Sequence, residues 1–282
     1  MEGRKVDILE RIHASYYQLT ATEKKVADYV TSNSDQVQYM SITQLADECG
    51  TAEATISRFC KSLGLKGFNA FKIELARDTV YVHHREAPHS TDTLKGRCQE
   101  IGRQAIAAIQ QTMELVDSAA VDQVVTMLQQ APRVLSIGSG GSMVIASECA
   151  HVFSTVTGKV CAVADSHMQM SAIATLEKGS VVLLFSYSGA TKNGMQVLEL
   201  AKSRGIQTVL VTRFSKSPAA KLADVVLQCG SQEDPFQFGS MPAKIAQLMV
   251  INVIFQEYVY RNREECEENI QAIASALSDM HI

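Results

Sequence analysis

Two short segments rich in serine and glycine carry the side chains best suited to chemistry in this sequence. Gly138–Ser142 (GSGGS) and Ser186–Thr191 (SYSGAT) each follow a short apolar run and precede a segment of helical length. Serine and threonine hydroxyls, together with backbone N–H groups at a helix start, can cradle a phosphate because no large side chain blocks its approach. The two segments predict a phosphate-binding site, with ordinary tight turns as the alternative, since turns also favour glycine and serine.

The first segment also matches part of the G-x-G-x-x-G pattern that binds dinucleotides. Gly138 and Gly140 match the first two glycines, but Met143 stands in place of the third. Asp165, at the end of the next apolar run, is placed like the acid that binds the ribose. The dinucleotide pattern gives no role to Ser186–Thr191, so a sugar phosphate is the favoured ligand.

A second pattern, between residues 43 and 64, is typical of a helix-turn-helix motif. Leu45 and the small Ala46 precede Gly50, which makes the turn between two helices. Ile56 and Phe59 then anchor the second helix on the core. This spacing leaves an outer arc composed of Thr55, Ser57, Arg58, Lys61 and Ser62. Hydroxyls and cations on such an arc can reach base edges and phosphates in a major groove.

The charge distribution supports this interpretation. Although the 282-residue chain has a net charge of -4, residues 51–77 contain five basic and two acidic residues, a local net charge of +3. Two glycines around Lys66 bring it near the same surface. The predicted DNA contacts are Thr51, Thr55, Ser57, Arg58, Lys61 and Lys66. The alternative is an ordinary helical hairpin with a solvated charged face.

The elements that must position these residues follow from the hydrophobic pattern. The expected strands are 133–138, 159–164, 180–186, 207–212 and 224–229. The expected helices are 94–116, 119–130, 143–157, 168–176, 192–204, 218–222, 243–261 and 264–280. Apolar strands alternating with helices predict an α/β doubly wound parallel five-stranded sheet, flavodoxin-like in order (2-1-3-4-5). That order reverses between the two strands that precede the serine-rich segments.

Residues 1–80 have only helical periodicity, and Thr20–Glu23 and Ser41–Gln44 are capping boxes that predict helix starts. The polar stretch 81–93 is expected to be a linker. We therefore expect two domains, an N-terminal all-α helix-turn-helix bundle and a C-terminal α/β domain over residues 94–282.

Composition narrows the class of protein further. No apolar run approaches the roughly 20 residues of a membrane span, so we predict no membrane partner. The seven cysteines are dispersed without a C-x-x-C pair, which indicates reduced, buried thiols in a cytoplasmic protein. The sequence predicts no metal site and no cofactor.

Together these segments resemble the RpiR family of bacterial regulators, in which a helix-turn-helix precedes a sugar isomerase (SIS) domain. The residues that carry the resemblance are EATISRFCKSLGLKGFNAFK (53–72), IGSGGS (137–142), FSYSGAT (185–191) and SMPAKIAQLMVIN (240–252). They occur in the family's order and extend over essentially the whole chain. The resemblance implies a bacterial transcription factor that responds to a phosphosugar.

The resemblance also assigns residues to the phosphosugar. The positions that hold the phosphate in SIS domains match Ser142, Ser186, Ser188 and Thr191, and Gly141 and Gly189 lie in the same loops. His167 is expected beside the sugar, with a surface or capping role as the alternative. Lys244 stands where the family carries a cation, although the family often has Ser-Arg where this chain has Ala243-Lys244. A solvated helix residue is the alternative for Lys244.

The predicted DNA-binding domain favours a ligand sensor over an enzyme, because sensing explains both domains with fewer assumptions. An active sugar-phosphate isomerase needs a base beside a carbonyl, and Glu233 falls near the position of a catalytic glutamate in SIS isomerases, with His167 able to assist. A surface acid is the simpler interpretation of Glu233. We therefore predict no enzymatic activity. We expect a homodimer or tetramer that binds a palindromic double-stranded DNA operator, and a phosphosugar effector that alters its DNA affinity.

Overall fold

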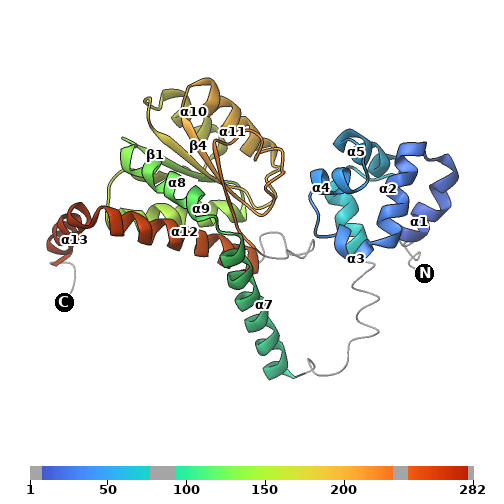
Figure 1. The fold of residues 1–282 in the computed structure, drawn as a ribbon, viewed down its shortest axis with the longest axis horizontal. Helices are drawn as coiled ribbons and strands as arrows, with labels where there is room; N and C mark the ends of the chain where they lie inside the picture. Colours follow the sequence, from blue (N-terminus) through green and yellow to red (C-terminus); the bar gives the residue numbers. More distant parts are fainter. Residues whose placement is uncertain (1–7, 77–92, 231–240, 279–282) are drawn as a thin grey trace. The chain divides into compact units, whose positions relative to one another are not determined.

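The computed structural model describes residues 8–76, 93–230 and 241–278 (Figure 1). The chain divides into two compact units between Arg103 and Gln104. Of the predicted linker at 81–93, all but Thr93 lies outside the described residues.

Residues 8–76 of the N-terminal unit form short helices packed on one apolar core. They are α1 (Ile8–Ser15), η1 (Tyr16–Gln18), α2 (Ala21–Ser32), α3 (Ser34–Val37), α4 (Ile42–Glu48), α5 (Glu53–Ser62) and a further helix over 68–76. Both predicted capping boxes are present, Thr20 with Glu23 and Ser41 with Gln44. Phe59 of α5 packs edge-to-face on Phe71, with ring centroids 5.7 Å apart, and both rings are fully buried. This core fixes the orientation of α5.

The C-terminal unit contains a five-stranded sheet in which all neighbouring strands are parallel. Its strands are β1 (Val134–Gly138), β2 (Val160–Ala162), β3 (Val181–Phe185), β4 (Gln207–Thr212) and β5 (Val225–Gln228). Their order is β2-β1-β3-β4-β5, which confirms the predicted doubly wound arrangement.

Helices cover both faces of this sheet (Figure 1). One face packs on α8 (Ser118–Gln130), α9 (Gly141–Ser154) and α12 (Met241–Arg261), and the other on α10 (Ser166–Thr175) and α11 (Lys192–Ser203). The strands supply both cores because their side chains alternate: Val181 and Leu183 of β3 face the first, whereas Val182 faces the second. The unit also contains the end of α7 (Leu94–Leu115) and, at its C-terminal end, α13 (Arg263–Leu277).

The predicted helix at 218–222 is wrong, because the structure has turns there. The segment is too short to propagate a helix, and the N–H of Ala219 donates instead to the carbonyl of Gly189, 2.9 Å away. The segment therefore supports the serine-rich loop 186–191.

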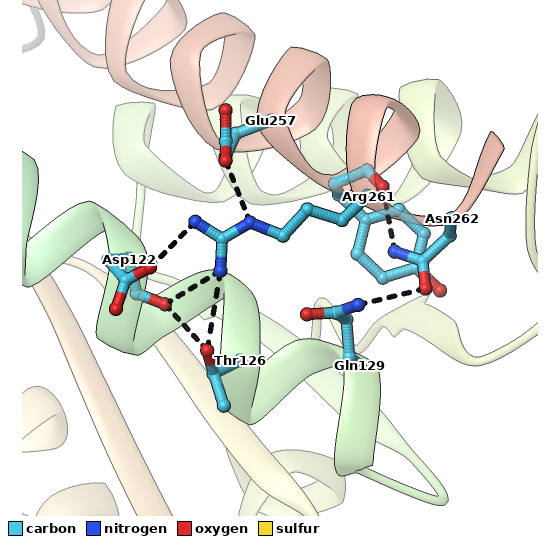
Figure 2. A network of polar contacts seen from close by, with 7 residues as sticks. Asp122, Thr126, Gln129, Glu257, Arg261 and Asn262 are labelled. Carbon is cyan, nitrogen blue, oxygen red and sulfur yellow. Dashed lines mark hydrogen bonds and ion pairs between the residues drawn. The ribbon is translucent and has the colours of Figure 1, made fainter.

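A polar network holds the end of α12 on α8 (Figure 2). Arg261 forms ion pairs with Asp122 of α8 (2.8 Å) and with Glu257 of its own helix (2.7 Å). Gln129 of α8 donates to the side-chain oxygen of Asn262, 3.1 Å away. These contacts fix the C-terminal end of the helix whose first turns carry Lys244.

The expectation of seven buried cysteines is only partly right. Cys98 and Cys161 are exposed, and the other five are buried. Burial raises the pKa of Cys60 and Cys149 to about 12 and that of Cys49 to about 11. Cys161 is exposed because it lies on β2, a strand at the sheet edge.

Candidate phosphate-binding site and helix-turn-helix

The two serine-rich segments leave the sheet side by side. β1 and β3 are direct neighbours, and Gly138 at the end of β1 is paired with Phe185 at the end of β3. The first segment begins at Gly138 itself and the second one residue after Phe185, so both start at the same place on the carboxyl edge, where the strand order reverses. This is the place where parallel α/β sheets bind ligands.

The first segment turns tightly from β1 into α9. A Cβ on Gly138 would lie 2.5 Å from the carbonyl oxygen of Ser142, so glycine alone permits this close approach. Gly140, with φ +55°, is the N-cap of α9 and offers no side-chain acceptor to the first turn. The backbone at Gly141 and the half-buried Ser142 can thus meet an anion without competition from a capping side chain.

The second segment contains a hydroxyl without a hydrogen-bond partner. Ser186 is 4% exposed, and its Oγ has no partner among the described residues. A buried unpaired hydroxyl is costly, and at the carboxyl edge of the sheet, where such sheets bind ligands, a bound anion would supply the missing acceptor. Ser188 Oγ accepts from the N–H of Ala190 (3.3 Å), and Thr191 Oγ1 caps α11 by accepting from the N–H of Gly194 (3.3 Å). Both hydroxyls keep a proton that they can donate to a phosphate oxygen.

Gly189 allows the second segment to fold in this way. Its φ of +58° lies in the left-handed region that favours glycine. A Cβ at this position would also lie 2.1 Å from Ser217 Oγ, so the loop could not rest on the 213–223 segment.

The other predicted sugar-site residues are more dispersed. His167 is exposed in the first turn of α10, which follows β2 at the same edge of the sheet. Asp165 caps that helix by accepting from the N–H groups of His167 (3.0 Å) and Met168 (2.9 Å). This capping role accounts for the carboxylate of Asp165 without the ribose contact that the dinucleotide alternative gave it. Lys244 is half-buried near the start of α12. Glu233 lies outside the described residues.

The sequence interpretation missed two residues at this edge. The fully buried Gln169 of α10 and the half-buried Asn193 of α11 hydrogen-bond to each other, 2.9 Å apart. A glutamine one helical turn before the buried Ile173 was the signal for an inward polar group.

The predicted helix-turn-helix is present in α4 and α5. Gly50 turns the chain with φ +58°, and the N–H of Thr51 donates to the carbonyl of Ala46 (2.8 Å). The predicted core positions Leu45, Ala46, Ile56 and Phe59 are all buried, and so are Cys60 and Leu63. Thr43 donates from Oγ1 to the carboxylate of Glu53 (2.7 Å), which joins α4 to the start of α5.

The predicted DNA-contact residues differ from the structure at two positions, Thr55 and Thr51. Arg58, Lys61, Ser62 and Lys66 are exposed, and Ser57 is half-buried. Thr51 is half-buried as a residue, but its Oγ1 is buried without a partner among the described residues. Thr55 is not on the outer arc: it is 5% exposed, because it lies one helical turn before Phe59 on the core side. Its Oγ1 accepts from Nη2 of Arg58 (3.1 Å), so Thr55 orients the guanidinium instead of facing outward.

Arg11 supports the other end of α5. Its guanidinium donates to the carbonyl of Leu63, directly after the helix. A cation at this position also complements the negative end of the helix dipole.

The described residues offer neither a membrane-spanning helix nor a cluster of metal-binding side chains. None of the helices in the described ranges is long and apolar enough to span a membrane. Among these same residues, no three histidine, cysteine, aspartate or glutamate side chains cluster in a way that could hold a metal ion.

Two family models match the chain. The model described as "Helix-turn-helix domain, rpiR family" matches residues 6–80, and the model of the SIS domain matches residues 127–256. An HTH-type transcriptional regulator of Caldanaerobacter subterraneus subsp. tengcongensis is 33% identical over 251 residues, 88% of this chain and 89% of the relative. The chain belongs to the rpiR family. It is a transcriptional regulator with a helix-turn-helix and a SIS domain.

One further relative and one solved structure match nearly the whole length of this rpiR-family regulator, and a second solved structure matches part of it. YbbH, an HTH-type transcriptional regulator of Bacillus subtilis, is 29% identical over 96% of this chain and 97% of its own. The solved structure of the Vibrio vulnificus NanR protein complexed with ManNAc-6P is 25% identical, with a TM-score of 0.86 over 98% of this chain and 100% of that one. The sugar isomerase domain of an RpiR transcription factor from Sphaerobacter thermophilus shares the fold at 19% identity, with a TM-score of 0.58 over 62% of this chain and 97% of that one.

Proposed function

We propose that this regulator controls genes of sugar or amino-sugar metabolism, and that a phosphosugar bound at the carboxyl edge of the sheet alters its affinity for an operator. In this proposal residues 1–80 bind double-stranded DNA, residues 81–93 are a linker and residues 94–282 bind the phosphosugar. The protein acts in the bacterial cytoplasm as a homodimer or tetramer on a palindromic operator, and is not an enzyme.

The observation that carries the proposal is the convergence of two hydroxyl-rich loops around a buried, unpartnered Ser186 Oγ. A phosphate oxygen is a strong acceptor for such a hydroxyl. The full-length similarity to NanR, whose structure holds ManNAc-6P, supports a phosphorylated amino sugar as the ligand class. The hydroxyls of Ser142, Ser188 and Thr191 complete the phosphate site, with His167, Lys244 and Glu233 directed to the sugar.

The DNA side of the proposal uses the exposed cations of α5. Arg58 and Lys61 approach bases and phosphates in the major groove, and Lys66 approaches the backbone beyond the helix. Ser57 adds a hydroxyl contact, and the buried Thr55 acts by orienting Arg58. Thr51 is left out of the DNA contacts because its Oγ1 is buried. Two such helices in a dimer would bind half-sites about one helical turn, or a multiple of it, apart.

Phosphosugar binding then biases the relative position of the DNA-binding domains. A coupling free energy of about 1–3 kcal/mol between two sites is typical of allosteric proteins and would change DNA affinity roughly 5- to 150-fold. The same coupling requires that operator DNA change the phosphosugar affinity by an equal factor.

The test separates the two activities. Thermal denaturation is measured with N-acetylmannosamine 6-phosphate, N-acetylglucosamine 6-phosphate, glucose 6-phosphate and inorganic phosphate. Binding to DNA fragments from the promoter region next to the regulator's own gene is measured by fluorescence anisotropy. At least one sugar phosphate should raise the melting temperature and change DNA affinity. If none of the three does either, phosphosugar control is wrong.

A charge-matched pair of variants tests the DNA face. Arg58→Ala should weaken DNA binding at least tenfold, about 1.4 kcal/mol, while the sugar phosphate still raises the melting temperature. Lys25→Ala removes an equal charge from an exposed site on α2 and should bind DNA like the wild type. Equal losses from the two variants would contradict a specific role for Arg58.

The isomerase alternative is tested with the same sugars. Incubation with the sugar phosphates should yield no aldose–ketose product. Turnover that is lost in Glu233→Gln would establish catalysis and overturn the pure-sensor proposal.

A further inference from the structure

The buried side chain of Gln169 joins the ends of two neighbouring strands. Its Nε2 donates to the carbonyl oxygens of Gly138, at the end of β1 (3.0 Å), and Val163, just after β2 (2.8 Å). Because Gln169 is fully buried, these bonds form away from water and each carbonyl depends on a protein partner. The amide therefore determines how the loops after β1 and β2 lie relative to each other.

Asn193 extends the connection to the loop after β3. Its Nδ2 donates to Gln169 Oε1 (2.9 Å) and to Ser139 Oγ (3.1 Å). Asn193 lies in the first turn of α11, two residues after Thr191, and Ser139 lies in the segment that leads to Ser142. Two amide side chains thus link the loops that follow the three neighbouring strands β2, β1 and β3 at the carboxyl edge.

Only one orientation of each amide group, that of Gln169 and that of Asn193, satisfies these hydrogen bonds. Both Nε2 protons of Gln169 face carbonyl acceptors, so its Oε1 must accept, and Asn193 must present its NH2 group to Oε1. A carboxylate at either position has no proton to donate and would break the chain of bonds. An apolar residue at position 169 would leave the carbonyls of Gly138 and Val163 without this donor.

We propose that Gln169 and Asn193 are positioning residues that hold the two hydroxyl loops at the separation needed to bind one phosphate. This inference rests on the proposed phosphosugar site. Gln169 acts only through other groups, since it is fully buried. Hydrogen bonds to a phosphate need donor–acceptor distances of about 2.7–2.9 Å, so a small change in loop separation loses donors on one side of the anion.

The direct test replaces Asn193 by alanine, because this half-buried residue can be removed with less risk to folding than Gln169. Asn193→Ala should bind N-acetylmannosamine 6-phosphate about tenfold more weakly, the loss expected from one or two hydrogen bonds. In the ligand-free protein, amide hydrogen exchange should accelerate in 138–142 and 186–191. Asn193→Asp keeps the size of the side chain but removes both donors, so it should accelerate the same exchange.

A matched control separates positioning from general stability. Asn269 is also half-buried, and its Nδ2 donates to the carbonyl of Val156 (2.9 Å), beyond the opposite end of α9. Asn269→Ala should lower the melting temperature without changing phosphosugar affinity or exchange in the two loops. Inorganic phosphate, which has no sugar to compensate, should lose affinity in Asn193→Ala but not in Asn269→Ala.

The outcomes distinguish this inference from the function on which it rests. If the wild type binds none of these anions, the proposed function fails, and hydrogen exchange in the ligand-free variants alone decides whether Asn193 positions the loops. If the wild type binds but both Asn193 variants match it in affinity and exchange, the positioning role is refuted and the proposed function stands.

Discussion

Replacing Ser186 by alanine should change the stability of the ligand-free protein and its phosphosugar affinity in opposite directions. In the ligand-free protein its Oγ is buried without a partner among the described residues, a situation that costs about 1–3 kcal/mol for a hydroxyl. Ser186→Ala removes that cost and loses only a few packing contacts. The free energy of unfolding should therefore stay constant or rise by up to about 1 kcal/mol, the lower end of that range.

The phosphosugar-bound protein should respond in the opposite way. A hydrogen bond from Ser186 to a charged phosphate contributes about 1.5–3 kcal/mol, so its loss should weaken binding roughly 10- to 150-fold. Chemical denaturation measures the first quantity and isothermal titration with N-acetylmannosamine 6-phosphate the second. DNA binding without ligand should match that of the wild type.

The structure offers a closely matched control on the same strand. Ser180 precedes β3, is fully buried and also has an Oγ without a partner among the described residues, but it lies at the opposite end of the strand from Ser186. Ser180→Ala should show the same unchanged or increased stability with unchanged phosphosugar affinity. A Ser186→Ala protein that is destabilised by more than about 1 kcal/mol and binds phosphosugar normally would refute the reasoning, because the hydroxyl would then have a structural role.

Three further predictions follow from the described residues. Gly189→Ala should lower the free energy of unfolding by at least about 1–2 kcal/mol in chemical denaturation, because alanine is strained at φ +58° and its Cβ has no space; a normal stability would show that the loop can relax. In a thiol assay at neutral pH, Cys98 and Cys161 should react promptly and the five buried thiols only in denaturant; a third fast thiol would contradict the described burial. Glu23 has a lowered pKa, mainly through the hydrogen bond from the Thr20 hydroxyl. Its stabilisation should therefore be complete above the ordinary carboxyl pKa of about 4.3 and be lost as pH falls through the lower folded-state value. Glu23→Gln should flatten the dependence of the free energy of unfolding on pH in this range. If the slope is unchanged in Glu23→Gln, other groups cause the loss of stability in acid.

Much of the fold was accessible from sequence because its determinants are local. The five apolar runs and their intervening helix-length segments predict the strand order β2-β1-β3-β4-β5 that the structure confirms. The capping boxes at Thr20 and Ser41 are four-residue signals, and both are present. The error at 218–222 has a local cause too, since five residues give too few hydrogen bonds to distinguish a helix from turns.

The exposure of individual residues was harder to predict from the sequence. Thr55 was expected on the outer arc because the spacing of the core positions left it there, yet its position one turn before Phe59 places it against the core. Cys161 was expected to be buried, but an edge position on β2 leaves it exposed. Residue type alone does not decide which side of an element is covered, because that depends on what packs against it.

The sequence by itself determined the helix-turn-helix spacing, the doubly wound sheet and the serine- and glycine-rich loops at its carboxyl edge, because each depends on neighbouring residues and on simple periodicity. The tertiary structure alone decided that Ser186 Oγ is buried without a partner and that Gln169 bonds to an asparagine 24 residues away. It also decided that Asn193 reaches Ser139 across 54 residues of sequence. Hydrogen bonds between such distant side chains exist only once the strands have paired and the loops have been brought to one edge.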